Sequence, residues 1–153
     1  MFRYVHTNII AKDPKRLIAF YKEVLNCKSF NSTRDLKGEW VDRFTGVKNA
    51  HIMGEHLVLP GYEDKLPTLE IFAYDKLHES LKHEINSPGF AHIAFEVDDV
   101  EATVEKLLKE GGTMVGEIIK ANYPNHVQAT LVYTRDPEGN IIELQSWKTI
   151  DSL

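Results

Sequence analysis

The two halves of the chain repeat one local pattern. In each half an apolar segment carries a histidine, and an aspartate follows at the same interval, so that His6 precedes Asp13 and His92 precedes Asp99. Each aspartate opens a stretch with apolar residues at helical spacing, where its carboxylate can cap the first amides of a helix. A repeat of this kind constrains the fold strongly, because it predicts two copies of one strand–helix module.

A glutamate recurs as well. Glu70 and Glu143 each lie in an apolar segment, and each is followed four residues later by an aromatic residue, Tyr74 and Trp147. Since strand side chains alternate between faces, each histidine and glutamate would lie opposite an aliphatic face that can cover a helix. Inward carboxylates without a cation are costly. The two imidazoles and two carboxylates, His6, Glu70, His92 and Glu143, therefore predict one four-ligand metal site built by both modules.

The first half is predicted to begin with a strand over 3–11 and a helix over 14–26. Asp13 can cap this helix, and Pro14 is tolerated at its first position. The apolar piece around 50–60 is a candidate for an additional strand. Three more strands are expected at 29–34, at 39–45 or slightly beyond, and at 67–74.

The second half repeats this order. A strand is expected over 90–97, followed by a helix that Asp98 or Asp99 caps and that Gly111 and Gly112 end. Further strands are predicted near 113–120, 127–135 and 140–147, the last two joined by a turn over 136–140.

These elements predict an α+β fold. Two βαβββ modules, about 1–86 and about 87–153, are expected to form a cup-shaped, mainly antiparallel sheet with helices on the outer face. The whole chain, 1–153, would be a single domain.

The composition of the chain limits the kinds of molecule that it is expected to bind. With 23 acidic and 18 basic residues the net charge is −5, and there is no basic run, which argues against nucleic acid as a partner. No apolar run approaches a membrane span and no signal-peptide core precedes the first strand, so we expect no membrane association and a cytoplasmic location. Cys27 is the single cysteine and predicts no disulfide. Exposed sheet edges favour a homodimer.

Strand alternation also predicts which residues face a small-molecule substrate beside the metal. The expected lining residues on strands are Asn8, Phe72, Tyr74, Gln145 and Trp147, and those in a polar loop before a strand are Tyr123 and His126. The remaining histidines lack a repeated partner and are predicted to be surface or loop residues: His51, His56, His78 and His83.

Three stretches resemble the vicinal oxygen chelate superfamily. They are DPKRLIAFYKEVLN after the first histidine, GFAHIAFEVDDVEATVEKLLKEGG around the second, and YTRDPEGNIIELQSW near the end. That superfamily includes glyoxalase I, methylmalonyl-CoA epimerase, extradiol dioxygenases, and fosfomycin- and bleomycin-resistance proteins. The resemblance implies one glyoxalase-like domain in which His6, Glu70, His92 and Glu143 bind one divalent ion. Nickel, cobalt, zinc, manganese and iron all remain open.

The four-ligand set resembles that of glyoxalase I and is close to that of the epimerase. This implies an isomerase, epimerase or lyase that moves a proton next to a carbonyl, with Glu143 as the first candidate base and Glu70 as the second. The chain departs from bacterial glyoxalases at Ile10 and Tyr74, where that family carries an Arg and an Asn that contact glutathione. These departures argue against glutathione and leave the substrate open, a CoA thioester included.

Two alternatives remain. An extradiol-type iron dioxygenase would use His6, His92 and Glu143 and leave Glu70 uncoordinated. A non-catalytic binding protein, similar to bleomycin-resistance proteins, would sequester a small molecule and would typically lack the four ligands. The sequence does not choose between modules that pair within one chain and modules that pair across a dimer.

Overall fold

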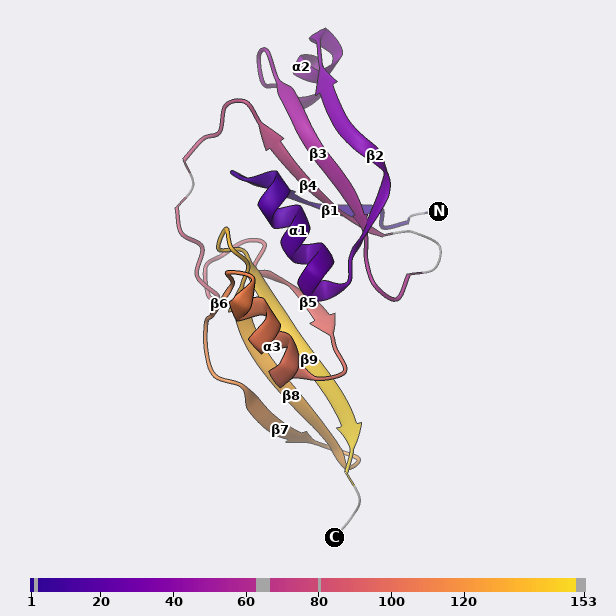
Figure 1. The fold of residues 1–153 in the computed structure, drawn as a ribbon, viewed down its shortest axis with the longest axis vertical. Coiled ribbons are helices and arrows are strands. Elements are labelled where there is room, and N and C mark those ends of the chain that lie inside the picture. Colours follow the sequence, from indigo (N-terminus) through magenta and orange to yellow (C-terminus); the bar gives the residue numbers. More distant parts are fainter. Residues whose placement is uncertain (2, 63–66, 80, 151–153) are drawn as a thin grey trace. The chain divides into compact units, whose positions relative to one another are not determined.

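The structure is a computed structural model that describes residue 1 and residues 3–62, 67–79 and 81–150. The chain divides into two compact units, unit one over Met1–Ser80 and unit two over Leu81–Leu153. Each unit contains a sheet and a long α-helix that packs on it (Figure 1). The predicted α+β class with two βαβββ modules is confirmed. That the two modules make one domain stays a prediction.

Unit one forms a four-stranded sheet in the order β1-β4-β3-β2. Its first and last strands, β1 and β4, are parallel neighbours, whereas the other pairs are antiparallel. Its elements are β1 (His6–Ile10), α1 (Pro14–Leu25), β2 (Lys28–Lys37), α2 (Glu39–Thr45), β3 (His51–Val58) and β4 (Thr68–Tyr74).

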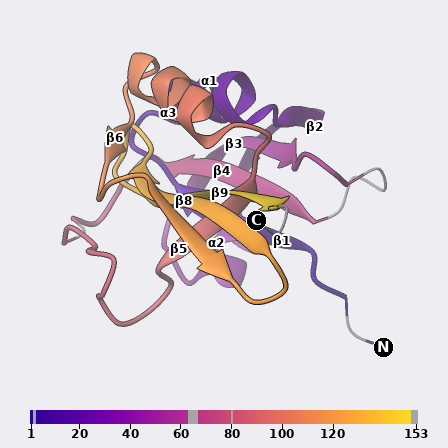
Figure 2. The same ribbon diagram turned by 90° about the horizontal axis from the view of Figure 1, so that it is seen from below.

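Unit two repeats this arrangement with the order β5-β9-β8-β6, and β7 pairs with β8. Again the first and last strands, β5 and β9, are parallel neighbours, and the remaining pairs are antiparallel. Figure 2 shows α3 on one face of the β8–β9 hairpin. The elements are β5 (His92–Glu96), α3 (Val100–Lys109), β6 (Thr113–Met114), β7 (Ile119–Tyr123), β8 (Val127–Arg135) and β9 (Ile141–Thr149).

Both long helices begin as the sequence predicts. The Asp13 carboxylate accepts the backbone N–H of Arg16, and the Asp99 carboxylate accepts that of Ala102. Asn26 ends α1 in the left-handed conformation, with φ of 54°. The predicted starts and the predicted helical spacing are therefore correct for both helices.

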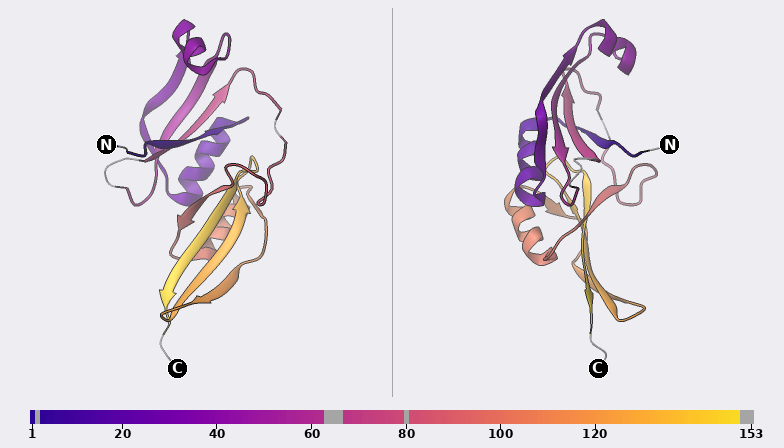
Figure 3. Two further views of the ribbon diagram at one scale, coloured as in Figure 1. Left: turned by 180° about the vertical axis from the view of Figure 1, so that it is seen from behind. Right: turned by 90° about the vertical axis from the view of Figure 1, so that its right-hand side faces the viewer.

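Each long helix covers one face of the sheet of its own unit (Figure 3). In unit one, Leu69 and Ile71 of β4 are fully buried, as are Leu17 and Tyr21 of α1. By alternation Glu70 points to the opposite face, which we call the open face of unit one. In unit two, Ile142 and Leu144 of β9 are fully buried in the same manner, which places Glu143 on the open face of that unit.

The strand predicted over 39–45 is wrong, because this segment is the helix α2. Gly38, with φ of 108°, ends β2, and Gly46, with φ of 73°, ends the helix. Val41 of α2 is buried in a small cluster with three other residues. The Asp42 carboxylate accepts the N–H groups of the two residues that lead into β3, at 2.7 and 2.8 Å. The burial of Val41 and the hydrogen bonds from Asn49 and Ala50 to Asp42, which the sequence pattern does not reveal, favour the helix.

For two other predicted strands, the structure adds detail to the prediction. The apolar piece around 50–60 does form a strand, β3. The strand near 113–120 is divided into the two short strands β6 and β7, separated by Gly116 and its neighbours. No helix in the described part of the chain has the length and apolar character needed to cross a membrane.

Candidate functional site

The first histidine–glutamate pair lies on the open face of unit one. His6 is on β1 and Glu70 on β4, and Asn8, two residues after His6, lies directly opposite Glu70. The Nε2 atom of His6 is 3.4 Å from Oε2 of Glu70. The histidine side chain is 42% exposed and the glutamate side chain only 11% exposed. Solvent and ligands therefore reach this pair from the histidine side.

The second pair has the same register. His92 is on β5 and Glu143 on β9, and Ala94, two residues after His92, lies directly opposite Glu143. The Nε2 atom of His92 is 3.1 Å from Oε2 of Glu143. The repeat found in the sequence is thus also a repeat of strand pairing, because both pairs form across the parallel neighbours that begin and end a unit.

A third imidazole lies beside the first pair. His56 of β3 is directly opposite Glu70, and its Nε2 atom is 2.9 Å from Oε1 of Glu70. Its other ring nitrogen, Nδ1, is 3.4 Å from the hydroxyl of Thr68. Burial lowers the pKa of His56, and the nearby charges of Arg34 and His6 act in the same direction, against the opposing effect of Glu70.

The prediction for the unpaired histidines is therefore wrong for His56, which lies in a strand with a largely buried side chain. His56 and His51 both lie in β3, with side chains 16% and 24% exposed. His78 does lie in an exposed loop. His83 lies outside helices and strands, but its Nε2 atom is buried without a hydrogen-bond partner among the described residues.

Tyr133 of β8 occupies the corresponding place in unit two. It lies directly opposite Glu143, and its ring centroid is 5.1 Å from that of His92. Burial and the charge of Glu143 raise the pKa of the Tyr133 hydroxyl. Tyr133 and Glu143 line a small pocket of about 160 Å³ with neighbours that are mostly apolar, among them Ile119 and Leu131. Glu143 therefore lies on the wall of a small cavity.

Sequence reasoning missed both His56 and Tyr133. The turn over 136–140 was recognised, and extending its hairpin outward places Tyr133 opposite Glu143. That signal was available. For His56, the sequence alone does not determine which residue of β3 faces Glu70, because no local pattern sets the pairing of β3 with β4.

The substrate-lining candidates of unit one lie close to Glu70. Asn8 donates a hydrogen bond from Nδ2 to Oε2 of Glu70 at 3.1 Å. Phe72 is buried, with its ring centroid 5.6 Å from that of His56. It belongs to the cluster that contains Val41 of α2, and Tyr74 packs against the same cluster. One end of the open face of unit one is thus covered by α2.

The candidates of unit two lie further along β9. Gln145 accepts a hydrogen bond from Nε1 of Trp147 at 2.8 Å. The Trp147 ring is 5.1 Å from that of Tyr123, and both side chains are nearly half exposed. Trp147 is four residues from Glu143, or about 13 Å along the strand. His126 is exposed, with φ of 57°, at the turn between β7 and β8.

The donor set fits a divalent metal ion in its chemistry. Two ligand atoms that are each about 2.1 Å from one ion, at roughly right angles, lie about 3 Å apart. The nitrogen–oxygen separations of 3.4 and 3.1 Å in the two pairs are close to this value. No group of three or more His, Cys, Asp or Glu side chains within the described ranges could by itself hold a metal ion. Each unit brings together two of the four predicted ligands.

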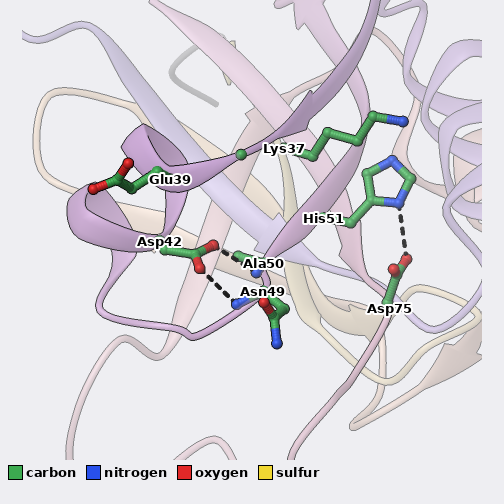
Figure 4. Close-up of a pocket in the computed structure, with 8 residues that line it drawn as sticks. Lys37, Glu39, Asp42, Asn49, Ala50, His51 and Asp75 are labelled. Carbon is green, nitrogen blue, oxygen red and sulfur yellow. Dashed lines mark hydrogen bonds and ion pairs between the residues drawn. The ribbon is translucent and has the colours of Figure 1, made fainter.

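A larger hollow, of about 570 Å³, lies at the end of unit one that carries α2 (Figure 4). His51 lies on its wall, with Nε2 2.7 Å from an oxygen of Asp35 and Nδ1 3.3 Å from an oxygen of Asp75. None of the predicted ligands lines this hollow. Figure 4 shows the ion pair between His51 and Asp75 and the two backbone hydrogen bonds that Asp42 accepts.

Comparisons of the sequence and of the structure with known proteins point to the same family. Residues 3–144 match the Glyoxalase/Bleomycin resistance protein/Dioxygenase superfamily. The chain therefore belongs to this superfamily, and the predicted resemblance is confirmed.

Individual relatives are more distant. The chain is 26% identical to a lactoylglutathione lyase of Haemophilus influenzae over 149 residues, which cover 97% of this chain and 95% of the relative. It is 25% identical to a lactoylglutathione lyase of Neisseria meningitidis, with coverage of 97% and 94%. A glyoxalase family protein of Bacillus cereus has a similar fold, with a TM-score of 0.80, 23% identity, and coverage of 96% and 95%.

Proposed function

We propose that this protein is a metal-dependent enzyme of the glyoxalase I-like or epimerase-like type, which moves a proton next to a carbonyl of a small molecule. The observation that carries the proposal is the equal register of the two histidine–glutamate pairs, at 3.4 and 3.1 Å, on the open faces of two repeated units. The relatives named lactoylglutathione lyase support the same class of chemistry.

In this proposal His6, Glu70, His92 and Glu143 together hold one divalent ion. Nickel, cobalt, zinc, manganese and iron are all compatible with imidazole and carboxylate ligands. The two units that share the ion belong either to one chain or to the two chains of a homodimer. Light scattering of the purified protein tests the dimer, and a mixture of His6→Ala and His92→Ala chains that regains metal binding would indicate pairing across chains.

The ion, when bound, supplies a positive charge that lowers the cost of negative charge on the substrate oxygens. Glu143 is the proposed base: its carboxylate takes the proton from the carbon beside the carbonyl and returns it to the same or the neighbouring carbon. The pocket beside Glu143 is lined in part by Tyr133, Ile119 and Leu131, which offer mainly apolar contacts to a substrate. Glu70 is the second candidate for this role.

The substrate is proposed to differ from a glutathione adduct. Ile10 and Tyr74 replace the two residues with which glyoxalases of this type contact glutathione. Ile10 is apolar and 45% exposed, and Tyr74 packs against the cluster beneath α2. Neither side chain offers the charge or the amide that those contacts require.

The test is solvent deuterium exchange into the substrate, followed by NMR. Protein purified without a histidine tag is loaded with each of the five metals and supplied with 2-oxoaldehyde adducts of several thiols and with 2-methyl-branched acyl thioesters. We expect metal-dependent exchange at the carbon beside the carbonyl with at least one of them. Glu143→Gln should abolish exchange while retaining metal, and full exchange in that variant would overturn the assignment of the base.

The same preparation separates the alternatives. Ring cleavage of a catechol by the iron-loaded protein under oxygen would indicate the dioxygenase. Failure to bind any of the five metals at one ion per two chains or more would indicate a non-catalytic binding protein.

A further inference from the structure

The two site glutamates differ in how they are held. In unit one both carboxylate oxygens of Glu70 have a partner from a neighbouring strand. Oε1 lies 2.9 Å from Nε2 of His56, and Oε2 accepts the hydrogen bond from Asn8 at 3.1 Å. Only 11% of the Glu70 side chain is exposed. Two partners on opposite strands fix the plane of this carboxylate, and Oε2 is the oxygen on the side of His6.

His56 is itself held in place. Its side chain is 16% exposed, its ring meets that of Phe72 edge to face, and Nδ1 is 3.4 Å from the hydroxyl of the buried Thr68. When the Thr68 hydroxyl donates to Nδ1, the ring proton is on Nε2, from which it is donated to Oε1 of Glu70. Thr68, His56 and Glu70 then form a short chain of hydrogen bonds that ends on the candidate ligand.

Among the described residues of unit two, no such chain of hydrogen bonds surrounds Glu143. The residues opposite Glu143 on its two neighbouring strands are Ala94, which has no polar side-chain atom, and Tyr133. Within the described part of the chain, Glu143 makes one ion pair, with His92. The Glu143 side chain is 20% exposed. The Nδ1 atom of His92 is buried and has no hydrogen-bond partner among the same residues. The equivalent positions of the two units therefore carry different chemistry.

We propose that His56 is a positioning residue that holds Oε1 of Glu70, so that unit one presents its carboxylate to the metal in one fixed orientation through Oε2. Because no residue within the described ranges fixes the Glu143 carboxylate in this way, Glu143 keeps the freedom to turn that a proton-transferring carboxylate needs. This inference rests on the proposed metal site, and it assigns unequal tasks to the two carboxylates: Glu70 stays a ligand and Glu143 moves the proton.

The first measurement uses the metal-free protein, so it depends only on the bond between His56 and Glu70. Nitrogen-15 spectra of the histidine side chains should show His56 as the Nε2–H tautomer, and Glu70→Gln should shift its resonances. A His56 that is protonated on Nδ1 only, or that is insensitive to Glu70→Gln, would overturn the proposal.

The second measurement is the affinity for cobalt(II) alone, by calorimetry, together with the visible absorption of the bound ion. His56→Leu removes the donor and should weaken binding by about 10-fold or more, as loss of a partner of a metal ligand typically does. His56→Gln places an amide N–H near the position of Nε2 and should restore most of the affinity. In His56→Leu, the Glu70 carboxylate is no longer held by the imidazole and can bind the ion through both oxygens. The cobalt spectrum of this variant should therefore also change.

The matched control is His51→Leu, which removes an imidazole and its carboxylate contacts from the same strand. It should leave cobalt affinity and spectrum unchanged even if it lowers stability. Equal cobalt affinity and spectrum for the wild type and His56→Leu would overturn the role of His56 and leave the proposed function intact. Absence of cobalt binding by the wild type, with the other four metals also unbound, would overturn the proposed function, whatever the nitrogen-15 result.

Discussion

His56 lies opposite Glu70 in the same register in which Tyr133 lies opposite Glu143. The two units therefore share the positions of their site residues but not the residue types. One unit places an imidazole beside its glutamate, with a nitrogen–oxygen distance of 2.9 Å, and the other places a phenol ring beside an apolar pocket. The two units thus differ at these positions although the pairing of their strands is equivalent.

Asn8 of β1 lies opposite Glu70, and Ala94 of β5 lies opposite Glu143. Substitutions at these two positions test the metal site through the free energy of unfolding. Asn8→Asp places a second carboxylate beside Glu70, and Ala94→Asp does the same beside Glu143. Both positions are exposed, so we expect each change to lower the free energy of unfolding of the metal-free protein by about 1 kcal/mol. Urea titrations with and without cobalt(II) check this.

Added metal should stabilise both aspartate variants more than the wild type, because the ion relieves the repulsion between the carboxylates. If only one of the two variants responds to metal, the two pairs do not share one ion.

Gly54 of β3 is expected to tolerate no larger residue without a loss of stability. A Cβ atom at this position would lie 2.0 Å from the carbonyl oxygen of Ile71 on β4, so the two strands would have to separate. We expect Gly54→Ala to destabilise the protein by about 2–4 kcal/mol in urea unfolding. Gly116→Ala, where a Cβ atom would meet nothing within 4 Å, is the control and should be nearly neutral.

The Lys22–Glu55 pair should make stability depend on pH. Burial acts to raise the pKa of Glu55, but hydrogen bonds from Lys22 and Ser29 and the charge of Lys22 outweigh it and leave the pKa below the ordinary value of 4.5. Because the folded-state pKa is lowered, the stabilisation is complete above 4.5 and is lost as the pH falls through the lowered pKa.

Glu55→Gln should therefore lower the free energy of unfolding by about 0.5–1 kcal/mol at pH 7 and by less at pH 3. Glu101→Gln, whose partner Lys120 is 3.4 Å away on a more exposed surface, should show a smaller effect. An equal loss for Glu55→Gln at both pH values would contradict this account.

Cys27 should be inert in the folded protein. It is 3% exposed, and burial raises the pKa of its thiol to about 12, so that the reactive thiolate is scarce at neutral pH. We expect no reaction with a thiol-specific disulfide reagent at pH 8 until guanidinium is added, and then one equivalent. Rapid labelling without denaturant would show that this core opens readily.

The sequence predicted the parts of the fold that depend on local rules. The caps at Asp13 and Asp99, the helical spacing and the duplicated histidine–glutamate pattern are all local, and the structure has them where expected. It did not predict α2, since EWVDRFT contains aromatic and β-branched residues that also suit a strand, and the burial of Val41 decides the matter. His56 was missed for a related reason. Its position opposite Glu70 depends on the pairing of β3 with β4 and not on any local sequence pattern.

The parallel pairing of the first and last strands has a consequence for assembly. His6 and Glu70 come from the two ends of unit one, and His92 and Glu143 from the two ends of unit two, so neither pair exists until the last strand of its unit has docked beside the first. Before that docking, each histidine is separated from the glutamate with which it pairs in the folded unit. In the proposed metal enzyme, a chain would therefore bind the ion through all four ligands only after both sheets are complete.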